Sequence, residues 1–228
     1  MAMVHHANRP DRPAERLARA LLRKQNPHFP AGSRHVNFEY LRHVIRARMF
    51  AALGKTARAI AEYREALGYD SAPVRARSAL AHLLAAEKRW EEAAPLFEQA
   101  IALDRGDAVA WFNLGFVRHQ QGQLEAAIEA FQAAVEIKPG IDRAWYGMGM
   151  AHASLGRHEQ AARALERAAE LQPMNPHAWY NLGMAYHTLH RPEKVEEVIR
   201  HIHRFDPKIS RQLILETERS DLAHLIGT

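Results

Sequence analysis

The chain has 228 residues, 47% of them hydrophobic and 25% charged, a composition typical of a packed protein rather than a disordered one. It has no cysteine, which excludes disulfides and thiolate chemistry and fits a reducing cytosol, so we expect a cytoplasmic protein. No apolar run approaches the roughly 18 residues of a membrane span, and the first residues, MAMVHHANR, lack the apolar core of a secretory signal.

The net charge of +5 is unevenly distributed along the chain. Residues 1–73 carry 13 Lys and Arg against 6 Asp and Glu, whereas the rest of the chain is close to neutral. A basic N-terminal third could attract nucleic acid, an anionic membrane surface or an acidic partner. We prefer the simpler interpretation of a solvated helix face rich in arginine.

The first segment contains one short predicted helix. Residues 1–13 are rich in polar residues and proline and are predicted to be disordered. Over residues 14–25 an apolar stripe around Leu17 and Leu21 predicts a short amphipathic helix, which residues 26–33 end with two prolines and a glycine. The stripe needs a covering surface. The next helices of the chain are the nearest candidate, and a membrane surface is the alternative.

From the middle of the chain onward the sequence repeats with a period of 34 residues. Three copies agree without insertion in a tryptophan, a glycine four residues later and a late proline: Trp111, Trp145 and Trp179; Gly115, Gly149 and Gly183; Pro139, Pro173 and Pro207. A fixed period of this size predicts a stacked array of identical supersecondary units.

This period and the Trp-x2-Leu-Gly core, in which Met148 replaces leucine once, resemble the tetratricopeptide repeat, a helix–turn–helix unit that binds other proteins. The resemblance implies an all-α fold, a right-handed α-solenoid with flanking helices at both ends. Two degenerate copies precede the three clear ones, with His43 and Arg77 at the tryptophan position. The expected organisation is a basic extension over 1–39, five repeats over 40–73, 74–107, 108–141, 142–175 and 176–209, and a C-terminal capping helix over 210–228.

The third repeat illustrates the packing that we expect within each unit. Trp111 and Gly115 share one face of the first helix, here called helix A. Gly115 and, on the second helix B, Ala127 are small because two backbones approach closely there, and Phe131 fills the adjoining space. The tryptophans are therefore interpreted as core residues rather than as a ligand cage.

The turn between the two helices predicts a left-handed backbone. Gly54, Gly122 and Gly156 follow helix A in three repeats, where glycine suits a left-handed cap. Lys88 and His190 replace it in the other two, and we expect these turns to be slightly weaker.

After Pro207 the period stops. Residues 210–228 mix leucine and isoleucine with charged residues and predict one more amphipathic helix, bent or straight. A terminal repeat leaves an apolar face exposed, so we assign this helix to capping in preference to partner binding.

The sequence contains no recognisable catalytic or metal-binding motif. There is no glycine-rich phosphate loop, no Gly-x-Ser-x-Gly and no His-Glu-x-x-His. The 15 histidines show no ligand spacing, since His201 and His203 lie two residues apart on a helix and point to different faces. We therefore expect neither an enzyme nor a bound metal or cofactor.

The resemblance implies a functional groove lined by helix A, at positions 2, 5, 6, 9 and 12 of each repeat. Carried onto the three clear repeats, these positions give the predicted groove residues Val109, Phe112, Asn113, Phe116, His119, Arg143, Tyr146, Met150, His177, Tyr180, Asn181, Met184 and His187. Gly147 and Ala153 occupy the other two positions. Aromatic and methionine side chains offer adaptable apolar contact, and asparagine can hold a peptide main chain.

The sequence thus predicts a protein–protein interaction module or adaptor that binds a peptide or helix of a partner protein. A second hypothesis is a scaffold that self-associates through its apolar ends, and a third is binding of nucleic acid or an anionic surface through the basic N-terminal third. The carboxylate clamp by which some of these repeats hold chaperone C-termini is not present, because Phe112 and Phe116 stand where it needs lysine and asparagine, and the other registers fail likewise.

Overall fold

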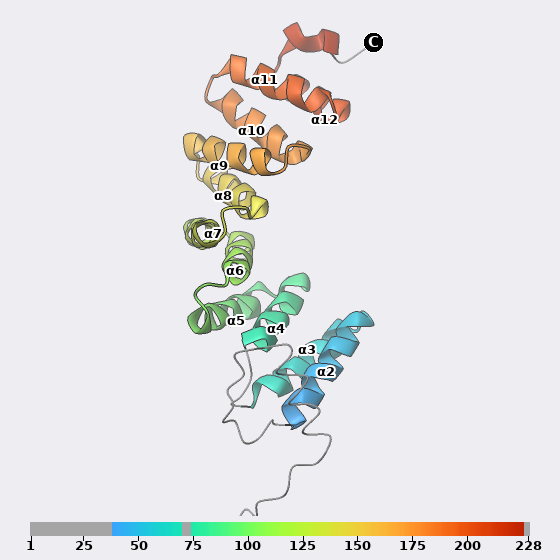
Figure 1. Ribbon diagram of the computed structural model, residues 1–228. Coiled ribbons are helices and arrows are strands. Elements are labelled where there is room, and N and C mark those ends of the chain that lie inside the picture. Colours follow the sequence, from blue (N-terminus) through green and yellow to red (C-terminus); the bar gives the residue numbers. More distant parts are fainter. Residues whose placement is uncertain (1–37, 70–73, 226–228) are drawn as a thin grey trace, which may run out of the picture. The chain divides into compact units, whose positions relative to one another are not determined.

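The computed structural model describes residues 38–69 and 74–225, and this part of the chain is entirely helical (Figure 1). The α-helices are α2 (Phe38–Ala52), α3 (Thr56–Leu67), α4 (Val74–Ala86), α5 (Trp90–Leu103), α6 (Ala108–Gln120), α7 (Leu124–Ile137), α8 (Asp142–Ser154), α9 (His158–Leu171), α10 (Pro176–Thr188), α11 (Pro192–His203) and α12 (Pro207–Glu216). A 3-10 helix, η1 (Ser220–Leu225), follows. The all-α prediction is confirmed. The expectations for residues 1–13, 14–25 and 26–33 lie outside the described residues.

The helices alternate between the two halves of the repeat. Helices α4, α6, α8 and α10 begin 34 residues apart, at Val74, Ala108, Asp142 and Pro176. They are the A helices, and α5, α7, α9 and α11 are the B helices. None of the described helices is long and apolar enough to cross a membrane.

The chain divides into two compact units, Met1–Ala76 and Arg77–Thr228, with the division inside α4. In the first unit α2 packs against α3, with Ala47, Ala59 and Ile60 buried. His43, at the tryptophan position, lies 2.7 Å from the Glu62 carboxylate. This degenerate repeat therefore joins its two helices through a polar pair.

In the second unit the turns after the A helices share one backbone conformation. Gly122 and Gly156 have φ of 74° and 70°, and Lys88 and His190 have φ of 58° and 53°. In the fifth repeat the amides of His190 and Arg191 donate to the carbonyls of His187 and Tyr186, which ends the helix in a left-handed cap. Lysine and histidine thus occupy a conformation that costs non-glycine residues energy.

The three tryptophans join each clear repeat to the chain before it. Their indole nitrogens donate to the carbonyl oxygens of Arg105, Pro139 and Pro173, each six residues earlier, at 3.1, 2.8 and 2.9 Å. Each indole is partly buried, and all three also pack against core clusters. Helix A is thereby held to the end of the preceding helix B.

The small residues of the A helices accept a ring or a branched side chain. A Cβ on Gly115 would lie 2.7 Å from Phe131, and one on Gly147 would lie 2.6 Å from the same ring. Phe131 of α7 thus packs against both α6 and α8. In the fifth repeat a Cβ on Gly183 would lie 2.6 Å from Leu213 of α12.

The C-terminal segment differs in detail from the single helix predicted over 210–228. Helix α12 already begins at Pro207 and ends at Glu216, because Glu218 has a φ of 55° and interrupts the helix before η1. Leu213, Ile214 and Leu222 from the two elements are buried in the same apolar cluster as α10 and α11.

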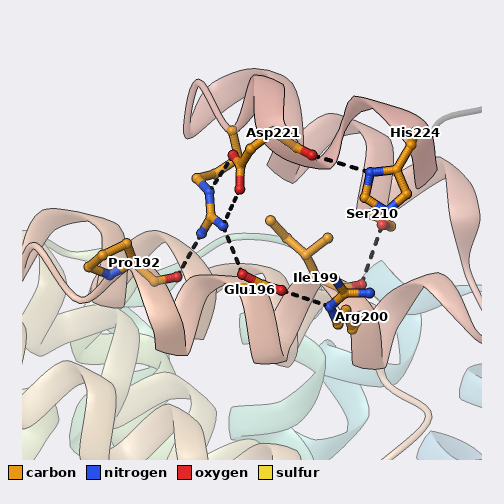
Figure 2. Close-up of polar contacts among 8 residues, drawn as sticks. Pro192, Glu196, Ile199, Arg200, Ser210, Asp221 and His224 are labelled. Carbon is orange, nitrogen blue, oxygen red and sulfur yellow. Dashed lines mark hydrogen bonds and ion pairs between the residues drawn. The ribbon is translucent and has the colours of Figure 1, made fainter.

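Arg219 fixes η1 to α11. Figure 2 labels its partners Pro192, Glu196 and Asp221, with the contacts as dashed lines. The Arg219 guanidinium donates to the Pro192 carbonyl at 2.6 Å, to Glu196 at 3.0 Å, and through two nitrogens to Asp221 at 2.8 and 2.6 Å. The Arg219 side chain is only 16% exposed. Nearby, the Ser210 hydroxyl donates to the buried Ile199 carbonyl. The last helix and η1 therefore cover the end of the array with both apolar and charged contacts.

Candidate functional site

All thirteen predicted groove residues lie on A helices of the second unit. Five are on α6, three on α8 and five on α10. Val109 and Phe116 stand out as large apolar side chains that are 53% and 41% exposed. The structure brings five of the thirteen to two separate hollows.

The first of these is the α8–α10 hollow, about 300 Å³ in volume, near the beginnings of the two helices. It is lined by Asp142, Arg143, Tyr146, Ala168, Asn175 and His177. Arg143, Tyr146 and His177 were predicted to belong to the groove, and they come from two successive repeats. Asn175 also caps α10, since its side-chain oxygen accepts from the His177 amide at 3.1 Å.

Contacts extend from this hollow to the neighbouring groove residues. The Arg143 guanidinium carbon lies 5.2 Å from the centroid of the Phe112 ring, on α6. The Asn181 amide nitrogen donates to the Tyr146 hydroxyl at 3.0 Å and to the His177 carbonyl at 2.8 Å. Burial raises the pKa of Tyr146, against the opposing effect of the Asn181 hydrogen bond. Side chains of α6, α8 and α10 thus form one connected row.

The second is the α4–α6 hollow, about 380 Å³ in volume, near the end of α4, the start of α5 and the second half of α6. It is lined by His82, Ala85, Ala86, Lys88, Trp90, Phe97, Asn113, Phe116 and Val117. Trp90 and Phe116 meet edge to face with centroids 5.9 Å apart, and His82 and Phe97 do so at 5.3 Å. Of this set, only Asn113 and Phe116 were predicted.

A hydrogen bond orders the polar side of the α4–α6 hollow. The Asn113 amide nitrogen lies 3.2 Å from Nε2 of His82, so the amide donates and this ring nitrogen accepts. Desolvation lowers the pKa of His82, against the opposing effect of Asp107, and favours the neutral imidazole that can accept.

Tyr180 marks the end of the row on α10. Its hydroxyl donates to the Glu216 carboxylate of α12 and accepts from Gln212 at 3.5 Å. Burial and the Glu216 carboxylate together raise the pKa of Tyr180 to about 12. Met184 packs against the apolar cluster that α12 completes. The last helix therefore occupies part of the surface predicted for this repeat.

The remaining groove residues, Val109, His119, Met150 and His187, line neither hollow. His119 has a buried Nε2 without a hydrogen-bond partner among the described residues. Within the same residues, no group of three or more His, Asp or Glu side chains is placed to hold a metal ion.

Sequence reasoning missed Trp90, although a signal was available. Trp90 is the first residue of its B helix, where the other repeats have Thr56, Leu124, His158 and Pro192. A tryptophan that departs from the repeat pattern at the start of a helix is not required by the shared core. It could therefore have been singled out as a surface or site residue.

Four family models for the same type of repeat match most of the chain. Models described as tetratricopeptide repeat match residues 46–108, 84–151 and 176–208, and one described as TPR repeat matches residues 149–189. A search of curated proteins found no match.

Solved structures with a similar fold include YrrB, described as a TPR protein with an unusual peptide-binding site. It is 24% identical, with a TM-score of 0.69 over 80% of this chain and 94% of its own. MamA is 22% identical, with a TM-score of 0.64 over 78% of this chain and 96% of its own. MamA from Desulfovibrio magneticus RS-1 is 18% identical, with a TM-score of 0.67 over 82% and 98%. At these identities the similarity concerns the fold.

Proposed function

Because this chain belongs to the tetratricopeptide repeat family, we propose that it is a non-catalytic, cytoplasmic adaptor whose A helices bind a segment of another protein. The surface is formed by the thirteen groove residues, and the row from Phe112 through Arg143 and Tyr146 to Asn181 is its centre. Members of the family bind proteins and peptides, and the similarity to YrrB, a protein described as having a peptide-binding site, supports this class of partner.

The observation that carries the proposal is the convergence of Arg143, Tyr146 and His177 on the α8–α10 hollow. Arg143 and His177 are exposed and bring cationic or hydrogen-bonding groups, while the Tyr146 and Phe112 rings bring apolar surface. A partner segment with some acidic character and intervening apolar side chains would complement this combination. Asp142 at the same hollow limits how much negative charge it accepts.

The asparagines of the groove favour an extended or helical main chain as the ligand. Asn113 and Asn181 use their amide nitrogens in contacts within the protein. Their side-chain oxygens remain suited to accept N–H groups of a bound segment. The protein thus holds the amides in place in advance, which reduces the entropy lost on binding.

A pull-down with the full chain, followed by mass spectrometry, tests the proposal. Proteins bound by the parent chain should be lost with Arg143→Glu and retained with Arg167→Glu, an exposed arginine of α9 whose ion pair with Glu170 is a surface contact. Tyr146→Ala should weaken binding about thirtyfold, as expected for an aromatic anchor. Identical sets of bound proteins from all three variants would show that the binding surface lies elsewhere.

Self-association is a second candidate function, supported by α2. Phe38, Ile45 and Met49 recur at spacings of seven and four residues that place them on one face of α2, and each is between 47% and 58% exposed. Leu53, just after the end of the helix, is 61% exposed. Apolar rows of this length on a helix commonly mark an interaction surface. A second copy of this helix would provide a matching face and give a two-fold dimer.

Light scattering, which measures the molar mass in solution, tests this second function. Ile45→Glu with Met49→Glu should convert a dimer into a monomer while leaving the α8–α10 hollow intact. A parent chain that is monomeric at all concentrations would exclude it.

A further inference from the structure

We infer that the α4–α6 hollow is a specificity subsite for one large apolar side chain of the partner segment, preferably aromatic, with an acidic residue beside it. The inference rests on the proposed binding of a protein segment. It adds which types of residue that segment contains.

The walls of the hollow are aromatic and open. The Phe116 side chain is 41% exposed, although α6 is packed between its neighbours. The Trp90 ring lies edge to face with it, with the ring centroids 5.9 Å apart. Phe97 lies beneath as a fully buried ring. An apolar side chain entering here would remove Phe116 from water and gain edge and face contacts with three rings.

The size of the hollow favours a single side chain. Its volume of about 380 Å³ lies at the lower end of the roughly 300–1,000 Å³ found for small-molecule pockets. A whole helix does not fit in such a space, whereas one tryptophan, phenylalanine or leucine side chain does.

The charge at the hollow determines which residue of the partner segment is preferred next to the inserted side chain. Lys88 is the charged residue among the nine that line it. No ion pair or hydrogen bond of its ammonium is seen in the described part of the chain. Nε2 of His82 accepts from the Asn113 amide, and desolvation lowers the pKa of His82, so both favour an uncharged ring beside Lys88. A carboxylate next to the inserted side chain would therefore meet Lys88.

The same combination does not recur in the other repeats. The position of Phe116 is occupied by Arg48, His82, Met150 and Met184, and no other described B helix starts with tryptophan, phenylalanine or tyrosine. The hollow is thus particular to the junction of the second and third repeats. A site that occurs once fixes the register of a bound segment along the array.

A phage-displayed library of random twelve-residue peptides, selected on the full chain, tests the inference. Enriched peptides should share a large apolar residue next to Asp or Glu. A synthetic peptide of that sequence should bind Phe116→Ala about thirtyfold more weakly. Lys88→Glu should lower affinity about fivefold, since an exposed ion pair is weak, and replacing the acidic residue by lysine should restore it. Lys138→Glu, at an exposed position after α7, is the matched control and should change nothing.

The outcomes separate this inference from the proposed function. Peptides whose affinity falls with Arg143→Glu but is the same for the parent chain, Phe116→Ala and Lys88→Glu would overturn the subsite. The proposed binding surface on the A helices would then stand. Enriched peptides without a shared large apolar residue would do the same. A parent chain that enriches no peptide would overturn the proposed function, and the subsite with it. Circular dichroism of each variant confirms that the helices are formed.

Discussion

The hydroxyl of Tyr180 on α10 donates a hydrogen bond to the carboxylate of Glu216 on α12. The equivalent ring of the preceding repeat, Tyr146, instead lines an open hollow. Two side chains at the same repeat position therefore have different surroundings, because only the last A helix is followed by α12.

The first prediction concerns alkaline pH. Because the pKa of Tyr180 is raised to about 12 from its ordinary value near 10, the unfolded chain loses this proton first as pH rises. The associated stability is present below pH 10 and is lost between pH 10 and 12. Urea unfolding should show a smaller loss over this window for Tyr180→Phe and for Glu216→Gln. Tyr186, also raised to about 12, accounts for part of the remaining loss. Equal losses in parent and variants would contradict the hydrogen bond.

The second prediction concerns the close approach at Gly147. Alanine there would place its Cβ 2.6 Å from the Phe131 ring, which Gly115 encloses from the other side. We expect Gly147→Ala to lower the free energy of unfolding by about 1–2 kcal/mol, the usual range for overpacking. Gly140→Ala is the control, because nothing lies within 4 Å of its Cβ. The two variants are compared by urea denaturation, and a stabilised Gly147→Ala would disprove the packing described.

The third prediction concerns the turn after α10. His190 has a φ of 53°, a region where glycine is free of steric cost. His190→Gly should raise the free energy of unfolding by about 0.5–1 kcal/mol, after allowance for the greater entropy of glycine in the unfolded chain. Gly156→Ala, at a φ of 70°, should lower it by a similar amount. Melting temperatures that move in the same direction for both variants would be inconsistent with the turn.

The fourth prediction concerns the C-terminal cover. Arg219→Ala removes hydrogen bonds to the Pro192 carbonyl, Glu196 and Asp221 and should cost about 1–2 kcal/mol. Arg211→Ala, an exposed change on α12, should stay within about 0.5 kcal/mol of the parent. Equilibrium unfolding in urea measures both. Equal effects would mean that the apolar contacts of Leu213 and Leu222 suffice to hold the segment.

The fifth prediction concerns mildly acidic pH. Burial, followed by the charges of Arg157 and Arg163, lowers the pKa of His152, and its Nδ1 is buried without a partner among the described residues. The unfolded chain therefore takes up this proton first, so stability is present above about pH 6.5 and falls as pH drops below it. His152→Gln should reduce the loss between pH 7 and pH 5, and His187→Gln, an exposed change, should not. Parallel curves for parent and His152→Gln would contradict the shift.

The repeat pattern was sufficient to predict the helices and their order. A period of 34 residues with tryptophan and glycine at fixed positions places both helices of each unit, because each unit needs the same core. The left-handed turns followed from Gly122 and Gly156, and Lys88 and His190 adopt the same conformation. The sequence could therefore predict the structural features that all repeats have in common.

The features that distinguish one repeat from another were harder to predict. Trp90 and Lys88 join Phe116 only because α4, α5 and α6 meet there, and no single repeat contains all three. The contact of Tyr180 with Glu216 joins residues 36 positions apart, beyond the end of the periodic pattern. Arg219, directly after the interruption at Glu218, bonds to Pro192 and Glu196 of the preceding repeat. Each of these features depends on contacts between repeats, which a helical period does not describe.

The indole-to-carbonyl bonds of the three tryptophans also bear on how the array unfolds. Each bond crosses from one repeat to the end of the one before it, so opening one unit strains its neighbour. At the two earlier tryptophan positions stand His43 and Arg77, which have no indole, and His43 instead faces Glu62 within its own repeat. In a linear array, cooperativity is set by such nearest-neighbour terms. The three bonds link the second repeat to the fifth, so the last four repeats are expected to melt together. The first repeat, which has no such bond to the second, is expected to open at lower cost, which makes it the part most accessible to proteases and chaperones in the cell.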